Sequence, residues 1–374
     1  MLRIERIVLR EIRLPLKEPF RISSGVVSER RITLLELHHP DGITGWSECV
    51  AGEQPNYSAE TIDTAWMAIR EWVAPRVLGR AFPGPEAVHA AIEHDFRGHN
   101  MAKAAVEMGC WALAAQIEGV PLSRLLGGTR DCVATGISIG IQKSPEELVS
   151  RALAAQEQGY SKIKIKIAPG SDLPFVRAVR EALGPEAHIM ADANSAYTLD
   201  DTPLLKQIDD FGLIMIEQPL APDDLVRHAK LQAQMRTPLC LDESVTSVDR
   251  AEDMIALASG RIINIKPGRV GGFTQSIAIH DVCRKNDIPV WCGGMLESGV
   301  GRAHNVALAA LPNFTLPGDL SPSSRYWERD IVTPEWTMGE DGMVAVPLGR
   351  PGLGVTVDLD RVDDLTVRSE TVGD

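Results

Sequence analysis

The sequence lacks long apolar runs and paired cysteines. No stretch of about 18 consecutive apolar residues occurs, so we expect no transmembrane helix. The start of the sequence, MLRIERIVLREIRLPL, carries a charge every two or three positions, which argues against a signal or transit peptide. The six cysteines form no CxxC pair and lie mostly in apolar runs. We therefore expect structural thiols in a reducing cytoplasm.

Basic residues are also in short supply. Lys and Arg number 38 against 51 Asp and Glu, which gives a formal net charge of −13. A chain this acidic is a poor partner for nucleic acid or an anionic membrane, so we expect neither. The nine histidines show no HxxxH or HExxH pattern, and no histidine metal site is predicted. With 44% hydrophobic residues the chain can form a large core. These features favour a cytoplasmic globular protein that binds a small molecule, and we expect a homo-oligomer.

The order of strand-like and helix-like segments predicts three parts. Residues 1–130 begin with antiparallel strands around the turn at 40–42, PDG, and continue with long helical stretches. Residues 131–322 alternate between short β-rich runs and amphipathic helices. Residues 323–374 return to strand and turn chemistry, and we expect them to pack back on the first part.

The alternating part predicts an α/β barrel. Strands that alternate with helices are typical of parallel βα units, and eight of them form a TIM barrel. The eight β-rich runs are ATGISIGI, KIKIKI, HIMADAN, LIMIEQP, PLCLDES, RIINIKP, PVWCGGM and FTLPGDL.

One charged residue stands at the carboxyl end of each of five successive runs. These residues are Lys166, Asp192, Glu217, Asp242 and Lys266, at intervals of 26, 25, 25 and 24 residues. Because barrel enzymes carry their chemistry at the carboxyl ends of the strands, we expect these side chains to meet at one mouth of the barrel. The run KIKIKI then directs its isoleucines toward the outer helices and its lysines toward the interior. There the carboxylates of the next three strands are the partners that buried lysines need.

Three carboxylates without histidine or cysteine ligands suit a hard divalent cation, Mg²⁺ or Mn²⁺, with Mg²⁺ favoured. Such an ion can stabilise the second negative charge that forms when the carbon next to a carboxylate loses its proton. Lys166 and Lys266 lie four strands apart in an eight-stranded barrel. They can therefore act on opposite faces of one enediolate, with Asp192, Glu217 and Asp242 as metal ligands.

The ordered set of motifs resembles the enolase superfamily, in its muconate-lactonizing subgroup. It is most similar to the o-succinylbenzoate synthase / N-acylamino acid racemase family. The resemblance covers essentially the whole chain through the motifs GHNMAKAAVEM, PLSRLLGG, KIKIKIAPG, ADANSAYT, IEQPL, CLDES, NIKPGRVGG, PVWCGGMLESG and ALPNFTLPGD.

The resemblance implies a fold, a reaction and further site residues. The fold is a modified TIM barrel, (β/α)7β, with an N-terminal α+β capping domain completed by the C-terminal segment. The reaction is dehydration to o-succinylbenzoate in the menaquinone pathway, racemisation of N-acylamino acids such as N-succinylamino acids, or both. The resemblance also makes Lys166 and Lys266 the acid/base pair and places a group of residues near the substrate or behind the ligands. That group comprises Lys164, Asn194 and Glu243. A small and mostly apolar substrate pocket is suggested by Ser138, Gly293, Gly294 and Met295.

The substrate is left open by the sequence. Dipeptide epimerases of the superfamily hold an α-ammonium with an Asp-x-Asp pair on strand eight, where this chain has Asp319-Leu320-Ser321. The missing second acid favours a substrate with an uncharged, acylated nitrogen or an aryl-succinyl group. Muconate cycloisomerisation is a further alternative, because it needs the same metal and lysines. A non-catalytic metal-binding barrel is the alternative of another class. Residues 20–27, FRISSGVV, are expected to form a mobile lid loop.

Lys266 must lose a proton before it can act as a base. The ordinary pKa of lysine is about 10.4, so a downward shift is required at neutral pH. Arg269 follows Lys266 by three residues, across the turn Pro267-Gly268. Its positive charge repels the lysine ammonium and is predicted to lower the pKa of Lys266. An arginine paired with an acidic neighbour is the open alternative.

Overall fold

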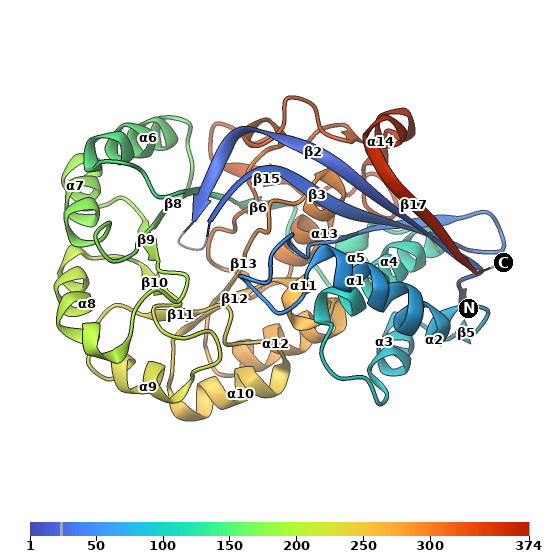
Figure 1. Cartoon of the computed structure of the whole chain (residues 1–374), viewed down its shortest axis with the longest axis horizontal. Coiled ribbons are helices and arrows are strands. Elements are labelled where there is room, and N and C mark those ends of the chain that lie inside the picture. Colours follow the sequence, from blue (N-terminus) through green and yellow to red (C-terminus); the bar gives the residue numbers. More distant parts are fainter. Residues whose placement is uncertain (23–24, 374) are drawn as a thin grey trace.

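The antiparallel part of the molecule is a four-stranded sheet built from both ends of the chain. The computed structural model describes residues 1–22 and 25–373. The strand order is β17-β2-β3-β4, and every neighbouring pair is antiparallel. The strands are β2 (Arg6–Ile22), β3 (Gly25–His38), β4 (Thr44–Cys49) and β17 (Thr366–Gly373). The C-terminal segment thus completes the N-terminal sheet, as predicted (Figure 1).

Helices pack on this sheet, and we call the sheet and these helices the cap. They are α1 (Ile62–Ala68), the π-helical turn η1 (Ile69–Val73), α2 (Ala74–Val77), α3 (Pro85–Glu93), α4 (Asn100–Glu118) and α5 (Leu122–Leu125). Two short strands, β1 (Leu2–Arg3) and β5 (Ala81–Phe82), pair at the edge of the cap. Every residue from Met101 to Ala115 in α4 is buried, because this helix contacts the cap sheet and also the barrel.

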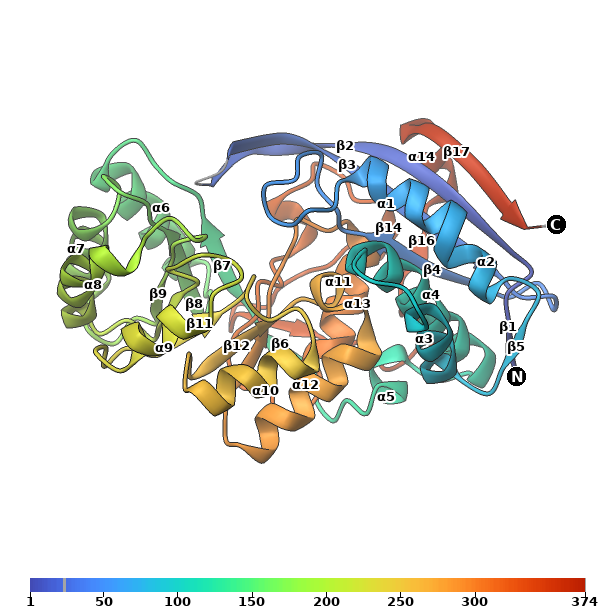
Figure 2. The same cartoon turned by 60° about the horizontal axis from the view of Figure 1, so that its bottom comes forward.

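The parallel part is a curled sheet of seven strands in sequence order. They are β7 (Gly136–Ile139), β8 (Lys162–Lys166), β9 (Ile189–Asp192), β10 (Met215–Glu217), β11 (Leu239–Leu241), β12 (Ile262–Ile265) and β13 (Val290–Cys292). The helical segments between and after them are α6 (Pro145–Glu157), α7 (Leu173–Leu183), η2 (Leu199–Asp201), α8 (Thr202–Ile208), η3 (Asp209–Phe211), α9 (Val226–Gln232), α10 (Val248–Leu257), α11 (Pro267–Val270), α12 (Phe273–Lys285) and α13 (Gly299–Ala309). Most of these helices lie outside the curled sheet (Figures 1 and 2). The predicted barrel fold is confirmed.

The eighth predicted strand is not a regular strand in the structure. Residues 314–320 contain Pro317, which has no N–H to donate to a ladder. The segment nevertheless joins both edges of the sheet. Asp319 N donates to Cys292 O of β13 at 2.8 Å, and Gly136 N of β7 donates to Gly318 O at 2.7 Å. A single irregular segment therefore lies where the eighth strand of the barrel was expected.

The alternating lysines and isoleucines of β8 are all buried. Ile163 and Ile165 belong to a hydrophobic cluster that also contains Val176 of α7. Lys162 points the other way, with its Nζ 3.6 Å from the ring centroid of Trp291 on β13. The isoleucines thus face the outer helices and the lysines face the barrel interior, which was the prediction from their alternation.

The loop predicted at residues 20–27 is instead a strand pair in the part that the structure describes, and its role as a lid stays a prediction. Phe20 pairs with Val27, Arg21 with Val26 and Ile22 with Gly25, so this segment continues the long hairpin of β2 and β3. Ser23 and Ser24 lie outside the described residues. The hairpin extends from the cap across to the barrel (Figure 1).

The remaining chain links the two parts with short elements. They are β6 (Cys132–Ala134), η4 (Ser323–Arg325), β14 (Val332–Thr333), β15 (Met343–Ala345), β16 (Thr356–Val357) and α14 (Leu359–Leu365). Strand β15 pairs with β6 directly before the barrel begins.

Two expectations from composition can be compared with the structure. Within residues 1–22 and 25–373, no helix combines the length and the apolar character that crossing a membrane requires. The six cysteines carry free thiols, and all but Cys132 are buried. This placement agrees with the predicted structural role of the thiols.

Candidate active site

The five charged strand-end residues lie together at one mouth of the barrel. Lys166, Asp192 and Glu217 end β8, β9 and β10, while Asp242 and Lys266 come directly after β11 and β12. All five are at most 8% exposed. Neighbouring parallel strands have their carboxyl ends at the same edge of the sheet. Residues that are about one βα unit apart in the sequence therefore come together at that edge.

Each of the two lysines is paired with a carboxylate of the cluster. Lys166 Nζ lies 2.5 Å from Asp192 Oδ2 and 2.8 Å from Asn194 Oδ1. Lys266 Nζ lies 2.6 Å from Asp242 Oδ2. Burial raises the pKa of Asp192, but Lys166 and its neighbours lower it more, and the net pKa lies well below the ordinary value. With the lysines on β8 and β12, the carboxylates lie between two ammonium groups.

Glu217 is held between the two paired carboxylates. Burial raises its pKa to about 8, and the negative charge of Asp192 contributes to the same direction. Asn264 Nδ2 on β12 donates to Glu217 Oε1 at 2.6 Å, which fixes the orientation of the carboxylate. Nearby, Glu243 has a buried Oε2 with no hydrogen-bond partner among the described residues, and burial raises its pKa to about 8.

The predicted metal ligands fit a hard divalent cation by donor chemistry. Asp192, Glu217 and Asp242 are buried carboxylates on three neighbouring strands, and their mutual repulsion is the kind that a cation relieves. In the part of the chain that the structure describes, no three acidic, imidazole or thiol side chains already form a metal centre. All three carboxylates contact lysines instead. Their assignment as ligands therefore remains a prediction.

The predicted effect of Arg269 on Lys266 is wrong. The Arg269 guanidinium donates to Asp242 and, through Nε, to Val245 O at 2.8 Å. It is thus an arginine paired with an acidic neighbour, because Asp242 lies between it and Lys266. Burial lowers the pKa of Lys266, but Asp242 and Tyr57 raise it more, and the net pKa lies well above the ordinary value.

Tyr57 was missed by the sequence analysis. Its hydroxyl donates to Asp242 Oδ1 at 2.8 Å, and its ring centroid lies 4.4 Å from Lys266 Nζ. Tyr57 belongs to a cap segment before α1, so the cap contributes a side chain directly to the strand-end cluster. A lone tyrosine in a polar stretch, NYSAE, carries no signal for this role.

Asp319 is paired with lysines of β8. Its carboxylate forms an ion pair with Lys164 and lies 3.4 Å from Lys162 Nζ. Lys164 Nζ also lies 3.3 Å from Glu217 Oε2. Burial raises the pKa of Asp319, but Lys164 lowers it more, to about 2. This carboxylate is therefore committed to the lysines of β8.

The predicted substrate-pocket residues surround the same mouth. Ser138 pairs in register with Lys164, and its buried Oγ has no hydrogen-bond partner among the described residues. Gly293 comes directly after β13, and a Cβ there would overlap the Asn264 side chain and lie 2.7 Å from Lys266 Cε. Gly294 and Met295 are the next two residues, both partly exposed at the mouth. Only glycine at position 293 leaves room for the side chains of Asn264 and Lys266.

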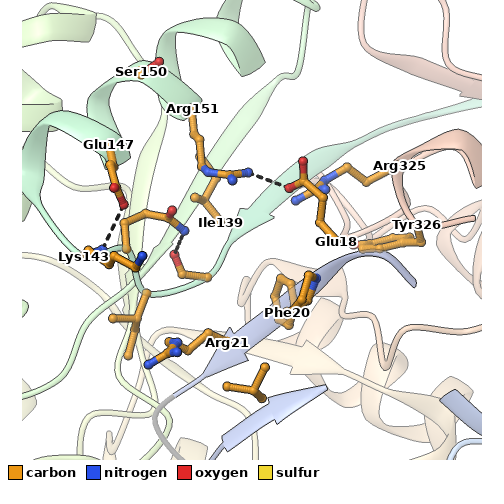
Figure 3. A pocket seen from close by; sticks show the side chains of 15 residues that line it. Glu18, Phe20, Arg21, Ile139, Lys143, Glu147, Ser150, Arg151, Arg325 and Tyr326 are labelled. Carbon is orange, nitrogen blue, oxygen red and sulfur yellow. Dashed lines mark hydrogen bonds and ion pairs between the residues drawn. The ribbon is translucent and has the colours of Figure 1, made fainter. Parts of the chain in front are cut away.

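A cavity of about 700 Å³ opens beside this mouth (Figure 3). Arg21 of the hairpin and Ile139 at the end of β7 line it, together with Tyr326. Arg151 Nη1 of α6 lies 2.8 Å from Glu18 Oε2 and links the barrel to the hairpin. None of the five charged strand-end residues lines this cavity, so it is a space next to the chemistry rather than its centre.

Comparisons with known families agree with both parts of the fold. Residues 4–127 match the mandelate racemase / muconate lactonizing enzyme N-terminal domain, and residues 147–362 match the enolase C-terminal domain-like family. The chain belongs to the enolase superfamily. Within this superfamily its relatives are o-succinylbenzoate synthases and N-succinylamino acid racemases, and the resemblance seen in the motifs is confirmed.

Individual relatives match along nearly the whole chain. The o-succinylbenzoate synthase of Geobacillus stearothermophilus is 48% identical over 363 residues, covering 97% of this chain and 96% of that protein. The N-succinylamino acid racemase of Thermus thermophilus is 48% identical over 366 residues, covering 98% of each. The crystal structure of an enolase-superfamily member from Listeria innocua superimposes with a TM-score of 0.96 at 40% identity, covering 100% of this chain and 99% of that one.

Proposed function

We propose that this enolase-superfamily chain is a divalent-metal-dependent enzyme that removes the proton next to a carboxylate. Its reaction is that of an o-succinylbenzoate synthase, an N-succinylamino acid racemase or both. The observation that carries the proposal is the pair Lys166 and Lys266, which approach one carboxylate cluster from β8 and β12. Relatives named for each of the two reactions are 48% identical to this chain.

The residues proposed to hold Mg²⁺, or Mn²⁺ in its place, are Asp192, Glu217 and Asp242. When bound, the ion supplies positive charge that stabilises the added negative charge on the substrate carboxylate. Asn264 supports this role because its hydrogen bond holds Glu217 in place. Enolase-superfamily membership supports a divalent metal in general, and the choice of Mg²⁺ rests on the all-carboxylate donor set.

The lysines are proposed to carry the proton. In racemisation, one lysine as the neutral amine takes the α-proton, and the opposite lysine as the ammonium returns a proton to the other face of the same carbon. In dehydration, one lysine as the neutral amine takes the α-proton. A lysine ammonium then gives a proton to the departing hydroxyl, which leaves as water as the C–O bond breaks and the C=C bond forms. Asn194 orients Lys166 through its hydrogen bond at 2.8 Å.

The ion pair of Asp319 supports the choice of substrate class. Because Asp319 already neutralises Lys164, it is poorly available to a substrate ammonium. An acylated nitrogen or an aryl-succinyl group is therefore favoured over the free amine of a dipeptide. Dipeptide epimerisation and muconate cycloisomerisation remain the alternatives within the superfamily.

The deciding experiment assays both reactions side by side on the metal-loaded protein. We expect dehydration to o-succinylbenzoate, racemisation of N-succinylamino acids, or both, and metal-dependent exchange of the α-proton in D₂O. A non-catalytic barrel would bind Mg²⁺ and exchange no proton, and that result would refute the proposal.

The two-lysine arrangement makes a stereochemical prediction. Lys166→Ala and Lys266→Ala should each abolish racemisation of an N-succinylamino acid. Each variant should still exchange the α-proton of one enantiomer in D₂O, and the two variants should prefer opposite enantiomers, as followed by NMR. Exchange of the same enantiomer by both variants would contradict the arrangement.

Several wider expectations are also proposals. The domain boundaries at 130/131 and 322/323 can be tested by limited proteolysis. A cytoplasmic location is supported by the six free thiols. A place in menaquinone synthesis, a homo-oligomeric state and the lack of nucleic-acid or membrane partners rest on composition and on the named relatives.

A further inference from the structure

The turn after β12 is packed against the cap. This turn, residues 266–272, begins with Lys266 and includes the short helix α11. Asn100, the first residue of cap helix α4, donates through Nδ2 to Arg269 O at 2.9 Å and to Thr246 O at 3.2 Å. A cap side chain therefore holds the backbone of the residue that contacts Asp242.

A second cap residue holds the far end of the same turn. Glu107 of α4 is fully buried and accepts hydrogen bonds from Phe273 N at 2.7 Å, Thr274 N at 2.9 Å and Thr274 Oγ1 at 2.6 Å. Trp111 Nε1 donates to the same carboxylate at 2.8 Å. A cap carboxylate thus satisfies the first N–H groups of barrel helix α12, where the helix dipole favours negative charge.

Two glycines in the turn make this close approach feasible. A Cβ at Gly268 would overlap Val50 of the cap, and a Cβ at Gly272 would overlap the Glu107 carboxylate. Gly272 also has φ +116°, which side chains rarely adopt. Contact with the cap thereby explains the glycines at positions 268 and 272 of the sequence KPGRVGG.

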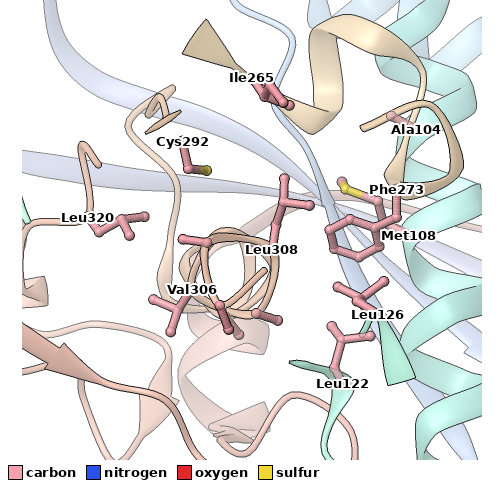
Figure 4. Packing of buried hydrophobic residues seen from close by; sticks show 14 of the residues in the cluster. Ala104, Met108, Leu122, Leu126, Ile265, Phe273, Cys292, Val306, Leu308 and Leu320 are labelled. Carbon is pink, nitrogen blue, oxygen red and sulfur yellow. The ribbon is translucent and has the colours of Figure 1, made fainter. Parts of the chain in front are cut away.

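Apolar packing continues the same interface. Met108 and Ala104 of α4 lie in one hydrophobic cluster with Ile265 of β12 and Phe273 of α12 (Figure 4). Ile265 immediately precedes Lys266. The side of the barrel that carries Lys266 is therefore embedded in the cap, and displacement of α4 would move this strand end.

The chain around Lys166 is supported differently. The next residue, Ile167, donates through N to Asp192 O at 2.9 Å, and Asp172 farther along accepts from Tyr197 OH at 3.4 Å. These partners belong to the barrel itself.

We propose that Glu107 and Asn100 are positioning residues that hold Lys266, and not Lys166, in place for proton transfer. The proposal rests on the function proposed above, in which each lysine serves one face of the α-carbon. It predicts that the cap controls one of the two stereochemical halves of the reaction.

The test is enantiomer-resolved α-proton exchange by the Mg²⁺-loaded full-length protein. Exchange that persists in Lys166→Ala defines the enantiomer served by Lys266. Burial raises the pKa of Glu107 to about 7, so exchange is measured at about pH 8.5, where the carboxylate is ionised. Glu107→Gln is expected to slow Lys266-dependent exchange roughly 10- to 100-fold, because small misplacements of a catalytic group have effects of this size. Lys166-dependent exchange should stay within about twofold of the wild type.

Asn100→Ala provides an independent test. Asn100 is only partly buried, so this variant is expected to fold even if Glu107→Gln does not, and it should show the same asymmetry between enantiomers. Asp358→Asn is the matched control, since it removes a carboxylate from the N-terminus of α14 in the C-terminal segment. This control should leave both exchange rates unchanged.

The possible results separate the two proposals. Failure of the wild type to exchange either enantiomer would refute the proposed function. If the wild type exchanges both, an equal loss of both rates in the folded variants, or no loss of either, would overturn the positioning role.

Discussion

Asp242 accepts contacts from three groups that come from two parts of the chain. Lys266 and Arg269 belong to the turn after β12, and Tyr57 belongs to the cap. Burial alone would raise the pKa of Asp242, but Lys266 and Arg269 hold it below the ordinary value. A charged carboxylate at this position therefore holds the cap and the acid/base lysine together.

Asp242→Asn should abolish turnover and weaken Mg²⁺ affinity. Asparagine keeps the shape and one acceptor oxygen but removes the negative charge that attracts the cation. Isothermal titration with Mg²⁺ and α-proton exchange at rising Mg²⁺ concentration would measure both effects, with circular dichroism to confirm the fold. Full activity at ordinary Mg²⁺ would remove Asp242 from the metal site.

At the level of residues, strand periodicity makes part of the site predictable from the sequence. The five strand-end groups are found together because each ends a strand of the same parallel sheet. Tyr57 and the ion pair between Lys164 and Asp319 could not be predicted in this way. Both depend on how a distant segment approaches the mouth, and residue type carries no information about that approach.

Within β8, Lys162 and Lys164 share one carboxylate. Lys162 is fully buried, and its Nζ makes no hydrogen bond among the described residues. Its neighbours are the Trp291 ring and Asp319, the nearest opposite charge. The barrel interior therefore depends on a carboxylate from the irregular segment 314–320.

Asp319→Asn should lower the free energy of unfolding by about 3–5 kcal/mol, because it leaves two buried ammonium groups without their shared partner. Adding Lys162→Met should recover part of this loss, since one uncompensated charge is then absent. Urea denaturation of the single and double variants would measure both changes. A loss below about 1 kcal/mol in the single variant would contradict the ion-pair account.

At the level of elements, the sequence predicts the regular barrel strands better than the irregular eighth segment and the end of the hairpin. The seven regular barrel strands coincide with seven of the eight predicted β-rich runs. The eighth run differs because Pro317 and Gly318 interrupt it. Serine and glycine indicated a loop over residues 20–27, while Phe20 and Val27 pair across a hairpin. Cross-strand pairing in the hairpin extends the strands farther than local turn propensity predicts.

For the molecule as a whole, the interface between cap and barrel buries acidic groups. Glu48 of β4 accepts from Ser298 Oγ at 2.6 Å and from Gly301 N at 3.1 Å, at the start of α13. Burial raises its pKa from 4.5 to about 8, and the charge of Glu297 acts in the same direction. The folded protein therefore binds a proton at Glu48 over a pH range in which the unfolded chain has released it.

This linkage gives a prediction with a definite sign. The stability contributed by protonated Glu48 is complete below about pH 4.5. It is lost as the pH rises toward 8, at about 1.4 kcal/mol per pH unit. Glu48→Gln carries no titrating proton, so its stability relative to the wild type should increase from pH 5 to pH 8. Urea midpoints at both pH values would measure it, with Glu252→Gln on the exposed face of α10 as control. A constant difference would contradict the prediction.

The pairing of β17 with β2 has a consequence for the order of events during protein synthesis. The ribosome releases residues 6–22 well before residues 366–373, yet these segments lie side by side in one sheet. We expect the barrel, whose strands are neighbours in sequence order, to be able to form on a nascent chain. The cap sheet is complete only after β17 has been synthesised and has paired with β2. A chain synthesised only as far as the barrel would then hold the lysines and carboxylates while β2 is still an unpaired edge strand, so this edge of the cap stays open until residues 366–373 leave the ribosome.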